Sequence, residues 1–318
     1  MVIVRSPCRV SFFGGSSDYE DFYSRHGSFI ISSTIDKYNY ISARFRPEII
    51  AGEHAISSQV LTDINKLSNP LLRETIKKYN VSKRTLDVNF FSDIPARTGL
   101  GGSSSCCCAL ISALNYLHGT FLSKKQIAQS AINVERKILQ ESGGIQDQIA
   151  ASYGGFNSIE IFKNGDFHVK PLPLTQEFKD YFLSCISLIY VKSERKGTAA
   201  ADSHKHKSQN KSRILKYARE AYSFFCREDL DSIMSLINDS WLEKKNISPH
   251  ISTEEIDSIE ASLRSLGSKS VKLLGAGGSG FLLSISDPDT NKKIKKKFNG
   301  RALNFKLDIE GTTCIFKN

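Results

Sequence analysis

The sequence predicts an α+β fold. Residues 1 to about 90 are rich in β-branched and aromatic residues and are divided by short turns, which is typical of strands. Helical patterns follow, and a second apolar strand at 184–191 precedes helices that extend to about residue 266. Strands followed by helices, rather than strict alternation, indicate the α+β class. The 318 residues fit one large domain or two interleaved ones, and we find no internal repeat or low-complexity linker.

The strands are expected where apolar residues alternate or form short runs. Residues 28–35 and 38–45 are both β-rich, and Asp36-Lys37 between them has the length of a hairpin turn, so a hairpin is predicted. Alternation at 86–91 predicts a further strand, and 156–162 predicts another.

The helices are predicted from capping signals and apolar periodicity. A helix from residue 123 through 135 has Ser123 as its N-cap and Gln126 in the capping-box position. A basic loop at 192–213 is expected to lead into the later helices. Other helices are expected at 70–79, at 109–117 and, on the surface, after 287–289.

The most informative stretch is 95–108, PARTGLGGSSSCCC, between a predicted strand and a predicted helix. A Gly/Ser loop in that position directs backbone N–H groups and the positive end of the helix at one point, which favours a phosphate. Glycine allows close approach of the backbone. The serines Ser103, Ser104 and Ser105 can cap the helix, donate to phosphate or ligate magnesium. Neither GxxxxGK[ST] nor GxGxxG occurs here, and a Ser-capped Gly-rich turn is the alternative.

Two further Gly-rich turns have related chemistry. Residues 5–19 contain a strand that breaks into Gly14-Gly15-Ser16-Ser17, with Arg9 before the turn and Asp18 after it. Residues 271–283 contain Gly275-Ala276-Gly277-Gly278-Ser279-Gly280 followed by an apolar strand. Three separated Gly-rich turns are hard to explain by the need for chain turns alone.

In this order and position, the three segments resemble motifs 1, 2 and 3 of the GHMP small-molecule kinases, which include galactokinase, homoserine kinase and mevalonate kinase. The segments 134–139, 143–155, 240–245 and 305–311 look like the branch of sugar 1-kinases that act on D-glycero-D-manno-heptose 7-phosphate. The resemblance covers nearly the whole chain. It implies an N-terminal domain at 1–183 and a C-terminal domain at 184–318 that meet at an ATP cleft.

The resemblance also implies roles for individual residues. Asp147, after a Gly-Gly turn, corresponds to the carboxylate that faces the acceptor hydroxyl, and a cap or turn Asp is the alternative. Arg9 corresponds to an Arg that bridges this base and the transferring phosphoryl group; otherwise it is a strand-end Arg facing solvent. ATP is expected on Thr98, Gly99, Leu100, Gly101, Gly102, Ser103, Ser104 and Ser105.

Magnesium and the sugar have their own implied ligands. Mg²⁺ is expected on Ser103 and Glu135, with Ser104 and Glu141 as alternatives to them. Asp18 corresponds to the carboxylate that grips sugar hydroxyls, although it is alternatively a helix cap. The remaining substrate residues are Gly14, Gly15, Ser16, Gly277 and Gly278, with Arg195, Lys196, Lys244 and Lys245 as candidates for a distal phosphate.

Composition narrows the classes of partner and the compartment. The net charge of +10 is dispersed along the chain, so we expect it to steer anionic substrates rather than bind nucleic acid. No apolar run approaches the ~20 residues that span a membrane, and no signal peptide is evident. Seven cysteines without a secretory signal indicate reduced, structural thiols. We therefore expect a cytoplasmic protein, a monomer or homodimer.

The implied reaction is ATP-dependent phosphorylation of the anomeric hydroxyl of heptose 7-phosphate, giving the 1,7-bisphosphate for nucleotide-activated heptose and surface polysaccharide. Motif 1 of those kinases has GGGTD, whereas Ser16 and Ser17 stand here, which adds a hydroxyl on the sugar side. The Glu and His that flank this turn in galactokinase are absent, so plain galactose is not expected. The alternatives are a fucose-type or mevalonate-type kinase and a non-catalytic ATP-binding regulator.

Overall fold

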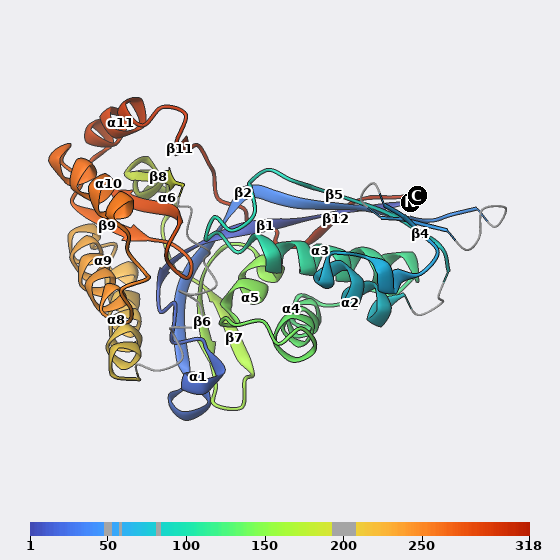
Figure 1. Cartoon of the computed structure of the whole chain (residues 1–318). Helices are drawn as coiled ribbons and strands as arrows, with labels where there is room; N and C mark the ends of the chain where they lie inside the picture. The colour runs from blue at the N-terminus through green and yellow to red at the C-terminus, as the bar shows by residue number, and fades with distance from the viewer. Residues whose placement is uncertain (48–52, 57–58, 81–83, 193–207) are drawn as a thin grey trace.

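The computed structural model describes residues 1–47, 53–56, 59–80, 84–192 and 208–318. A large sheet with helices on one face forms one end of the molecule, and a four-stranded sheet with its own helices forms the other (Figure 1). The two chain termini lie together at the far end of the large sheet (Figure 1). This mixture of segregated strands and helices confirms the predicted α+β class. Among the described residues, no helix is long and apolar enough to cross a membrane.

The large sheet has the strand order β12-β1-β2-β5-β3-β4, with β6 also paired to β2 and β7 paired to β6. All its pairs are antiparallel except β3 with β5. Its strands are β1 (Val2–Phe13), β2 (Ser28–Phe45), β3 (His54–Ile56), β4 (Gln59–Leu61), β5 (Leu86–Ser92), β6 (Phe156–Ile161), β7 (Phe167–Pro171) and β12 (Thr313–Lys317).

The predicted hairpin at Asp36-Lys37 is wrong, because β2 runs unbroken through these residues. The first part of β2 pairs with β6 and the second part with β5, while β1 pairs along the other edge. The register with β1 shifts between Pro7 and Cys8, which leaves Asp36 and Lys37 as a bulge. The Asp36 N–H is satisfied by the carbonyl of Lys306 at 2.9 Å instead. The polar pair therefore marks a bulge and not a turn.

The helices of this domain are α1 (Glu20–His26), α2 (Pro70–Tyr79), α3 (Gly102–Leu117), α4 (Lys124–Ile132) and α5 (Gln146–Tyr153), with a short 3₁₀ turn at Ile64–Lys66. The helix predicted at 70–79 is confirmed, and so is the capping box of Ser123 and Gln126. A π-helical segment, Asn133–Ile138, continues α4 and presents Glu135 on its inner side. Such segments are frequent at functional sites.

The cysteines of α3 are structural. All seven cysteines of the chain are free thiols, and Cys107 and Cys108 are fully buried in the packing of α3 against its neighbours. Burial raises the pKa of the Cys106 thiol to about 12, and it raises the pKa of the other two as well. These thiols are therefore protonated and unreactive, as the sequence suggested for structural positions.

The second sheet has the order β11-β8-β10-β9 and is fully antiparallel. Part of the loop predicted at 192–213 lies outside the described residues, but 208–213 already belong to a helix. The elements of this domain are α6 (Gln176–Ser184), β8 (Ile186–Val191), α8 (Ser208–Cys226), α9 (Leu230–Lys245), α10 (Glu254–Ser265), β9 (Ser270–Leu273), β10 (Gly280–Ile285), α11 (Pro288–Lys297) and β11 (Ala302–Leu303).

The end of the chain departs from the predicted division at 183/184. Strand β12 returns to the large sheet and pairs with β1, where Val2 lies opposite Lys317. The turn before it is fixed to β2, because the Thr34 hydroxyl donates to the carbonyl of Asp308 at 2.8 Å. Burial of β1 between two partners satisfies its backbone groups on both edges. Strand β12 and the turn before it therefore pack with the large sheet of the N-terminal domain.

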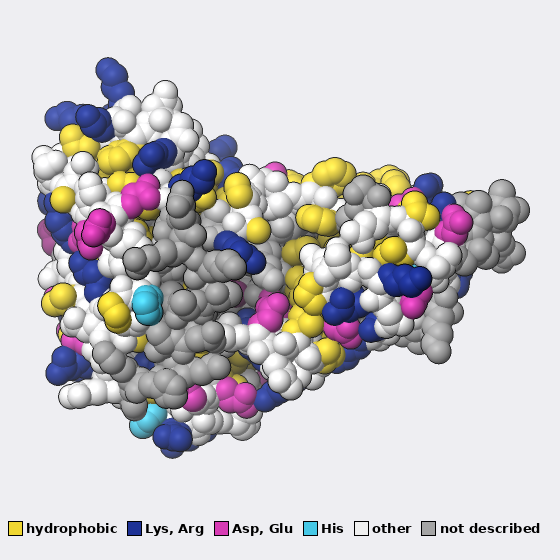
Figure 2. Space-filling view, viewed as in Figure 1, with side chains coloured by type: hydrophobic (Ala, Val, Ile, Leu, Met, Phe, Trp, Pro, Cys, Tyr) yellow, Lys and Arg dark blue, Asp and Glu magenta, His cyan; other side chains and the backbone are white. Residues whose placement is uncertain are grey.

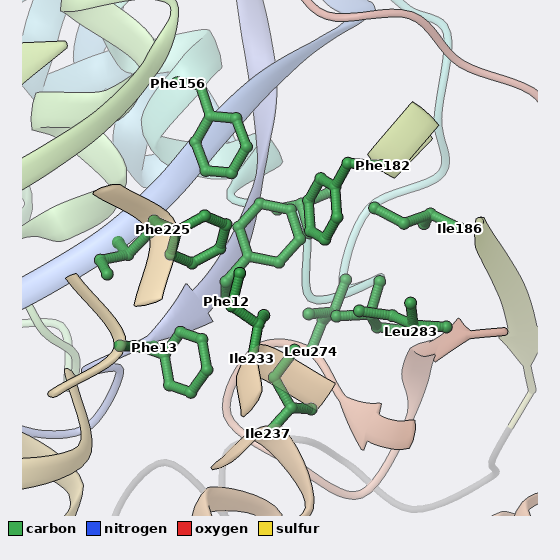
Figure 3. Close-up of a cluster of buried hydrophobic side chains, with 14 of the residues drawn as sticks. Phe12, Phe13, Phe156, Phe182, Ile186, Phe225, Ile233, Ile237, Leu274 and Leu283 are labelled. Carbon is green, nitrogen blue, oxygen red and sulfur yellow. The ribbon is translucent and has the colours of Figure 1, made fainter. Parts of the chain in front are cut away.

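A cluster of phenylalanines joins the two domains. The rings of Phe12 and Phe156 from the large sheet lie 5.1 Å apart, and Phe182 and Phe225 from the second half pack at 5.4 Å from Phe12 and Phe156 respectively (Figure 3). All four side chains are at least nine-tenths buried. Burying each ring stabilises the fold by roughly 1.5–3 kcal/mol. The cluster therefore holds the end of β1, which carries motif 1, against the second domain.

Candidate active site

The three Gly-rich segments converge on one cavity of about 340 Å³ at the seam between the two sheets. Its walls come from the end of β1, the loop before α3, the π-helical segment, the start of α5 and the turn between β9 and β10. The loop before α3 and the turn between β9 and β10, about 90 and 260 residues after Arg9 in the sequence, thus line the same site as Arg9.

Contacts between glycines hold these turns together. Gly99 has φ of +79°, and a Cβ there would lie 2.6 Å from the carbonyl oxygen of Leu274. Gly275 packs in turn on the Cα of Gly99, where a Cβ would come within 2.4 Å. The Phe281 N–H donates to the carbonyl of Thr98 at 3.2 Å, which ties β10 to the loop. Only glycine fits these approaches, so the turn of motif 3 packs directly on the loop at 95–101, which we call the phosphate loop after its predicted role.

Arg9 and Asp147 form an ion pair inside the cavity. The Arg9 Nε and Nη2 donate to the two carboxylate oxygens of Asp147, each at 2.8 Å. The Arg9 Nη1 donates to the carbonyl of Gly99, and its backbone N–H donates to the carbonyl of Leu100 at 2.9 Å. A bidentate guanidinium fixes a carboxylate in both position and plane. The pair therefore orients Asp147 beside the phosphate loop, while Asp147 keeps 24% of its side-chain surface exposed.

Asp18 lines the same cavity, and only 1% of its surface is exposed. Its carboxylate accepts the N–H of Ser16 at 3.0 Å and the N–H of Gln146 at 3.1 Å. Gly144 packs on the same carboxylate so closely that a Cβ would lie 1.8 Å from Oδ2. Burial raises the pKa of Asp18, and the charge of Asp147 raises it further, while the two N–H groups oppose the shift. Asp18 is not a helix cap, since Tyr19 occupies that position of α1.

The serines of the phosphate loop do not cap α3. Gly101, with φ of +73°, is the N-cap residue, and no side chain caps the helix. Ser105 is buried and donates to the carbonyl of Ser6, and the side chain of Leu100 is buried in the core. The side chains of Leu100 and Ser105, two of the predicted ATP residues, therefore stabilise the loop from the core and do not line the cavity. The predicted residues that do line the cavity are Thr98, Gly99, Gly101, Gly102, Ser103 and Ser104.

Glu135 meets Ser104, the alternative to Ser103. The Ser104 hydroxyl donates to Glu135 Oε2 at 2.7 Å, and the Gln148 amide donates to the same oxygen. Ser103 lies one residue away, exposed at the cavity wall. Among the described residues, Glu135 Oε1 is buried and accepts no hydrogen bond, and burial raises the pKa of the carboxyl group. A buried oxygen without a partner beside a hydroxyl fits the one or two protein ligands that Mg²⁺ uses.

The predicted substrate residues divide into those that line the cavity and those that do not. Gly15, Ser16, Asp18, Gly277 and Lys244 line it. Gly14 instead makes a tight turn against the carbonyl of Phe29, and the Gly278 N–H donates to the carbonyl of Ile251. Lys245 pairs with Glu260 at 3.3 Å and does not face the cavity. Arg195 and Lys196 lie outside the described residues.

Sequence reasoning missed several residues of the wall. Lys272 lines the cavity from β9, where a charged residue within an otherwise apolar strand was the only signal. Gln146 accepts the Ser11 hydroxyl at 2.7 Å through Oε1 and so connects motif 1 to the start of α5. Arg97 and Arg136 also line the cavity. On the face shown in Figure 2, Lys and Arg side chains are spread over both ends of the molecule.

Replacing Gly101 by Val is expected to raise the dissociation constant of ATP by at least about 10-fold, because φ of +73° strains a β-branched residue. The new Cβ would also lie 3.3 Å from both Arg9 Cγ and Asp147 Cγ, so turnover should fall with affinity. Calorimetric titration of ATP checks the first effect. Unchanged ATP affinity in a folded variant would show that the nucleotide binds elsewhere.

Comparison with known proteins identifies the family. Residues 67–155 match the GHMP kinases N terminal domain, and residues 221–303 match the GHMP kinases C terminal domain. The two matches cover just over half of the chain and both of its halves. The chain belongs to the GHMP kinases.

Individual relatives extend over the full length of the chain. A D-glycero-alpha-D-manno-heptose 7-phosphate kinase of Campylobacter jejuni is 26% identical, over 96% of each chain. A mevalonate kinase of Methanocaldococcus jannaschii is also 26% identical, over 100% of each chain. The crystal structure of a D-glycero-D-manno-heptose 1-phosphate kinase from Bacteriodes thetaiotaomicron superposes with a TM-score of 0.82 at 21% identity and covers 100% of both chains. At that identity the structural likeness shows the shared fold.

Proposed function

We propose that the protein is an ATP-dependent sugar kinase that phosphorylates the anomeric hydroxyl of D-glycero-D-manno-heptose 7-phosphate to the 1,7-bisphosphate. The observation that carries the proposal is the Asp147 carboxylate, which Arg9 holds at the phosphate loop in the same cavity as the buried Asp18. A base, an anion-binding loop and a hydroxyl-binding carboxylate are the parts that phosphoryl transfer to a sugar needs.

Each residue of the cavity has a separate role in the proposed transfer. Asp18 accepts hydroxyl donors of the sugar and sets its orientation in the cavity. Asp147 accepts the proton of the anomeric hydroxyl while the oxygen of that hydroxyl attacks the terminal phosphorus of ATP. Arg9 and the N–H groups of the phosphate loop stabilise the charge on the phosphoryl oxygens during transfer. Glu135 and Ser104 would hold Mg²⁺, which neutralises phosphate charge when bound.

The choice of acceptor rests on the Campylobacter jejuni relative. That relative is a heptose 7-phosphate kinase, and it is similar over 96% of this chain. The equally similar mevalonate kinase favours a second candidate, a mevalonate-type alcohol. An anionic group is common to both acceptors, and the cavity has cationic residues for it in Lys244 and Lys272. Fucose-type sugars, which carry no anion, are the less favoured alternative.

We expect heptose 7-phosphate to be preferred over unphosphorylated heptose by at least about 10²-fold in kcat/KM, because charge-assisted hydrogen bonds to phosphate contribute about 1.5–3 kcal/mol each. ATP consumption measured with heptose 7-phosphate, heptose, fucose, galactose and mevalonate checks this. Phosphorus NMR of the product then locates the new phosphate on the anomeric carbon. Equal values for the two heptoses, or turnover of mevalonate alone, would overturn the proposed acceptor while leaving the kinase mechanism in place.

A further inference from the structure

Two lysines of the C-terminal domain are buried at the cavity wall. Lys244 lies in the last turn of α9 and Lys272 in β9, and their exposed fractions are 5% and 4%. Lysine is almost never fully buried unless it is paired. Both side chains nevertheless line the same cavity as Asp18 and Asp147. Their placement there calls for a ligand-based explanation.

Both ammonium groups bond to backbone carbonyls. The Lys244 Nζ donates to the carbonyl of Leu273 at 2.9 Å and to that of Gly275. The Lys272 Nζ donates to the carbonyl of Phe12 at 2.6 Å and reaches that of Ser11 at 3.4 Å. Each ammonium has three donors, so one hydrogen of each remains once its partners among the described residues are counted. Within the described part of the chain, neither lysine forms an ion pair.

The surroundings of the two lysines are more cationic than anionic. The charges that act on Lys244 are those of Lys272, Arg9 and Asp18, and the charge that acts on Lys272 is that of Arg9. Aromatic rings also lie close to both lysines: the Trp241 ring lies 5.9 Å from the Lys244 Nζ, and the Phe13 ring lies 5.9 Å from the Lys272 Nζ. A buried charge without a counter-charge is costly. An arriving anion would remove that cost.

We propose that Lys244 and Lys272 together hold the acceptor's own phosphate and thereby determine specificity for a phosphorylated sugar. The claim rests on the proposed function for the identity of the acceptor. A chain of hydrogen bonds connects Lys272 to Asp18, the residue proposed to bind the sugar. Lys272 donates to the carbonyl of Ser11, the Ser11 hydroxyl donates to Gln146, and the Gln146 N–H donates to Asp18. The nucleotide phosphates have the separate donors of the loop before α3. The lysine pair is thus available for a second phosphate.

Binding is coupled to proton uptake. Burial, reinforced by the charge of Arg9, lowers the pKa of Lys272 to about 7, and burial with the charge of Lys272 lowers the pKa of Lys244. At pH 8 Lys272 of the empty cavity is therefore largely neutral. A sugar phosphate, with a second pKa of about 6, is a dianion at that pH and favours the charged lysines. Each binding event should consequently take up a proton from solution.

The test compares Lys244→Met and Lys272→Met with Lys245→Met, the matched control from the same helix that points away from the cavity. Removing one charged donor should raise KM for heptose 7-phosphate at least about 10-fold, while KM for ATP stays the same. In the Lys245→Met control, both KM values should stay the same. Titration of heptose 7-phosphate at pH 8 in HEPES and in Tris, whose ionisation enthalpies differ, should show proton uptake by the wild type. The uptake should fall in the Lys272→Met variant. Thermal melting confirms that each variant is folded.

Three results separate the possibilities. An unchanged KM for the sugar with undiminished proton uptake overturns the lysine assignment, and a raised dissociation constant for ATP alone assigns the pair to the nucleotide instead. If the wild type neither binds nor phosphorylates heptose 7-phosphate, the proposed acceptor is wrong. The lysines are then judged by titrating inorganic phosphate into the enzyme saturated with a non-hydrolysable ATP analogue. Equal phosphate affinity in wild type and variants there overturns the assignment as well.

Discussion

Replacing Asp147 by Asn is expected to lower kcat by at least about 10²-fold, within the 10²–10⁴ range typical of a lost general base. The amide is almost the same size and stays within reach of Arg9, but it no longer accepts the proton of the attacking hydroxyl. We place the ATP site on backbone groups of the loop before α3 as a proposal, and on that basis the dissociation constant of ATP should change by less than about 2-fold. Steady-state kinetics and ATP calorimetry check the two parts of this prediction.

The matched control for this variant is Asp289→Asn. Asp289 lies in the first turn of α11, and 82% of its side chain is exposed. It pairs with Lys292 on the same helix, so its replacement should leave kcat unchanged. The Asp147 variant should also be less stable, by about 1–3 kcal/mol, because the buried Arg9 loses its counter-charge. Near-wild-type turnover in a folded Asp147→Asn protein would remove Asp147 from the mechanism.

The sequence predicts the elements whose signals are local. The capping box of α4 and the helical pattern of 70–79 depend on residues that are close together in the sequence, so α4 and α2 are found correctly. The predicted hairpin at Asp36-Lys37 fails because a turn and a bulge have the same polar composition. Which one forms depends on β1 and β6, which pair with this strand from distant parts of the sequence. Likewise, nothing near β12 indicates that it pairs with β1.

The same distinction applies to the site. The Gly-rich motifs predict the phosphate loop, and the resemblance of the chain to the GHMP kinases predicts four further site residues. The structure brings all four to one cavity: Arg9, Asp18, Glu135 and Asp147. The choice between Ser103 and Ser104 was open, because adjacent residues of a helix differ in direction by about 100° and its phase is not visible in the sequence. Lys272 was missed for a similar reason. Its importance comes from burial beside β1, which is a tertiary property.

The last prediction concerns Gly144, whose replacement by Ala should lower kcat/KM for the sugar by more than about 10²-fold. The added Cβ would lie 1.8 Å from Asp18 Oδ2, whereas ordinary contact begins at 3.4 Å, so the two groups must separate by about 1.6 Å. Asp18 has little room to move, because it is buried and is held by the N–H groups of Ser16 and Gln146. If Gly144 moves instead, it displaces the turn that leads to Asp147. A misplacement of about 1 Å in a reacting group costs about 10²-fold.

Two further variants make this prediction specific to the Asp18 contact. Gly119→Ala adds a methyl group where no atom lies within 4 Å, so it should cost some stability through its φ of +73° and leave kinetics unchanged. The double variant Gly144→Ala, Asp18→Ala removes the overlapping carboxylate, so its melting temperature should recover relative to Gly144→Ala while sugar turnover stays low. ATP affinity should be unaffected throughout. Wild-type kcat/KM in Gly144→Ala would mean that the Asp18 carboxylate does not need its present position to hold the sugar, and Asp18 would then lose its assigned role.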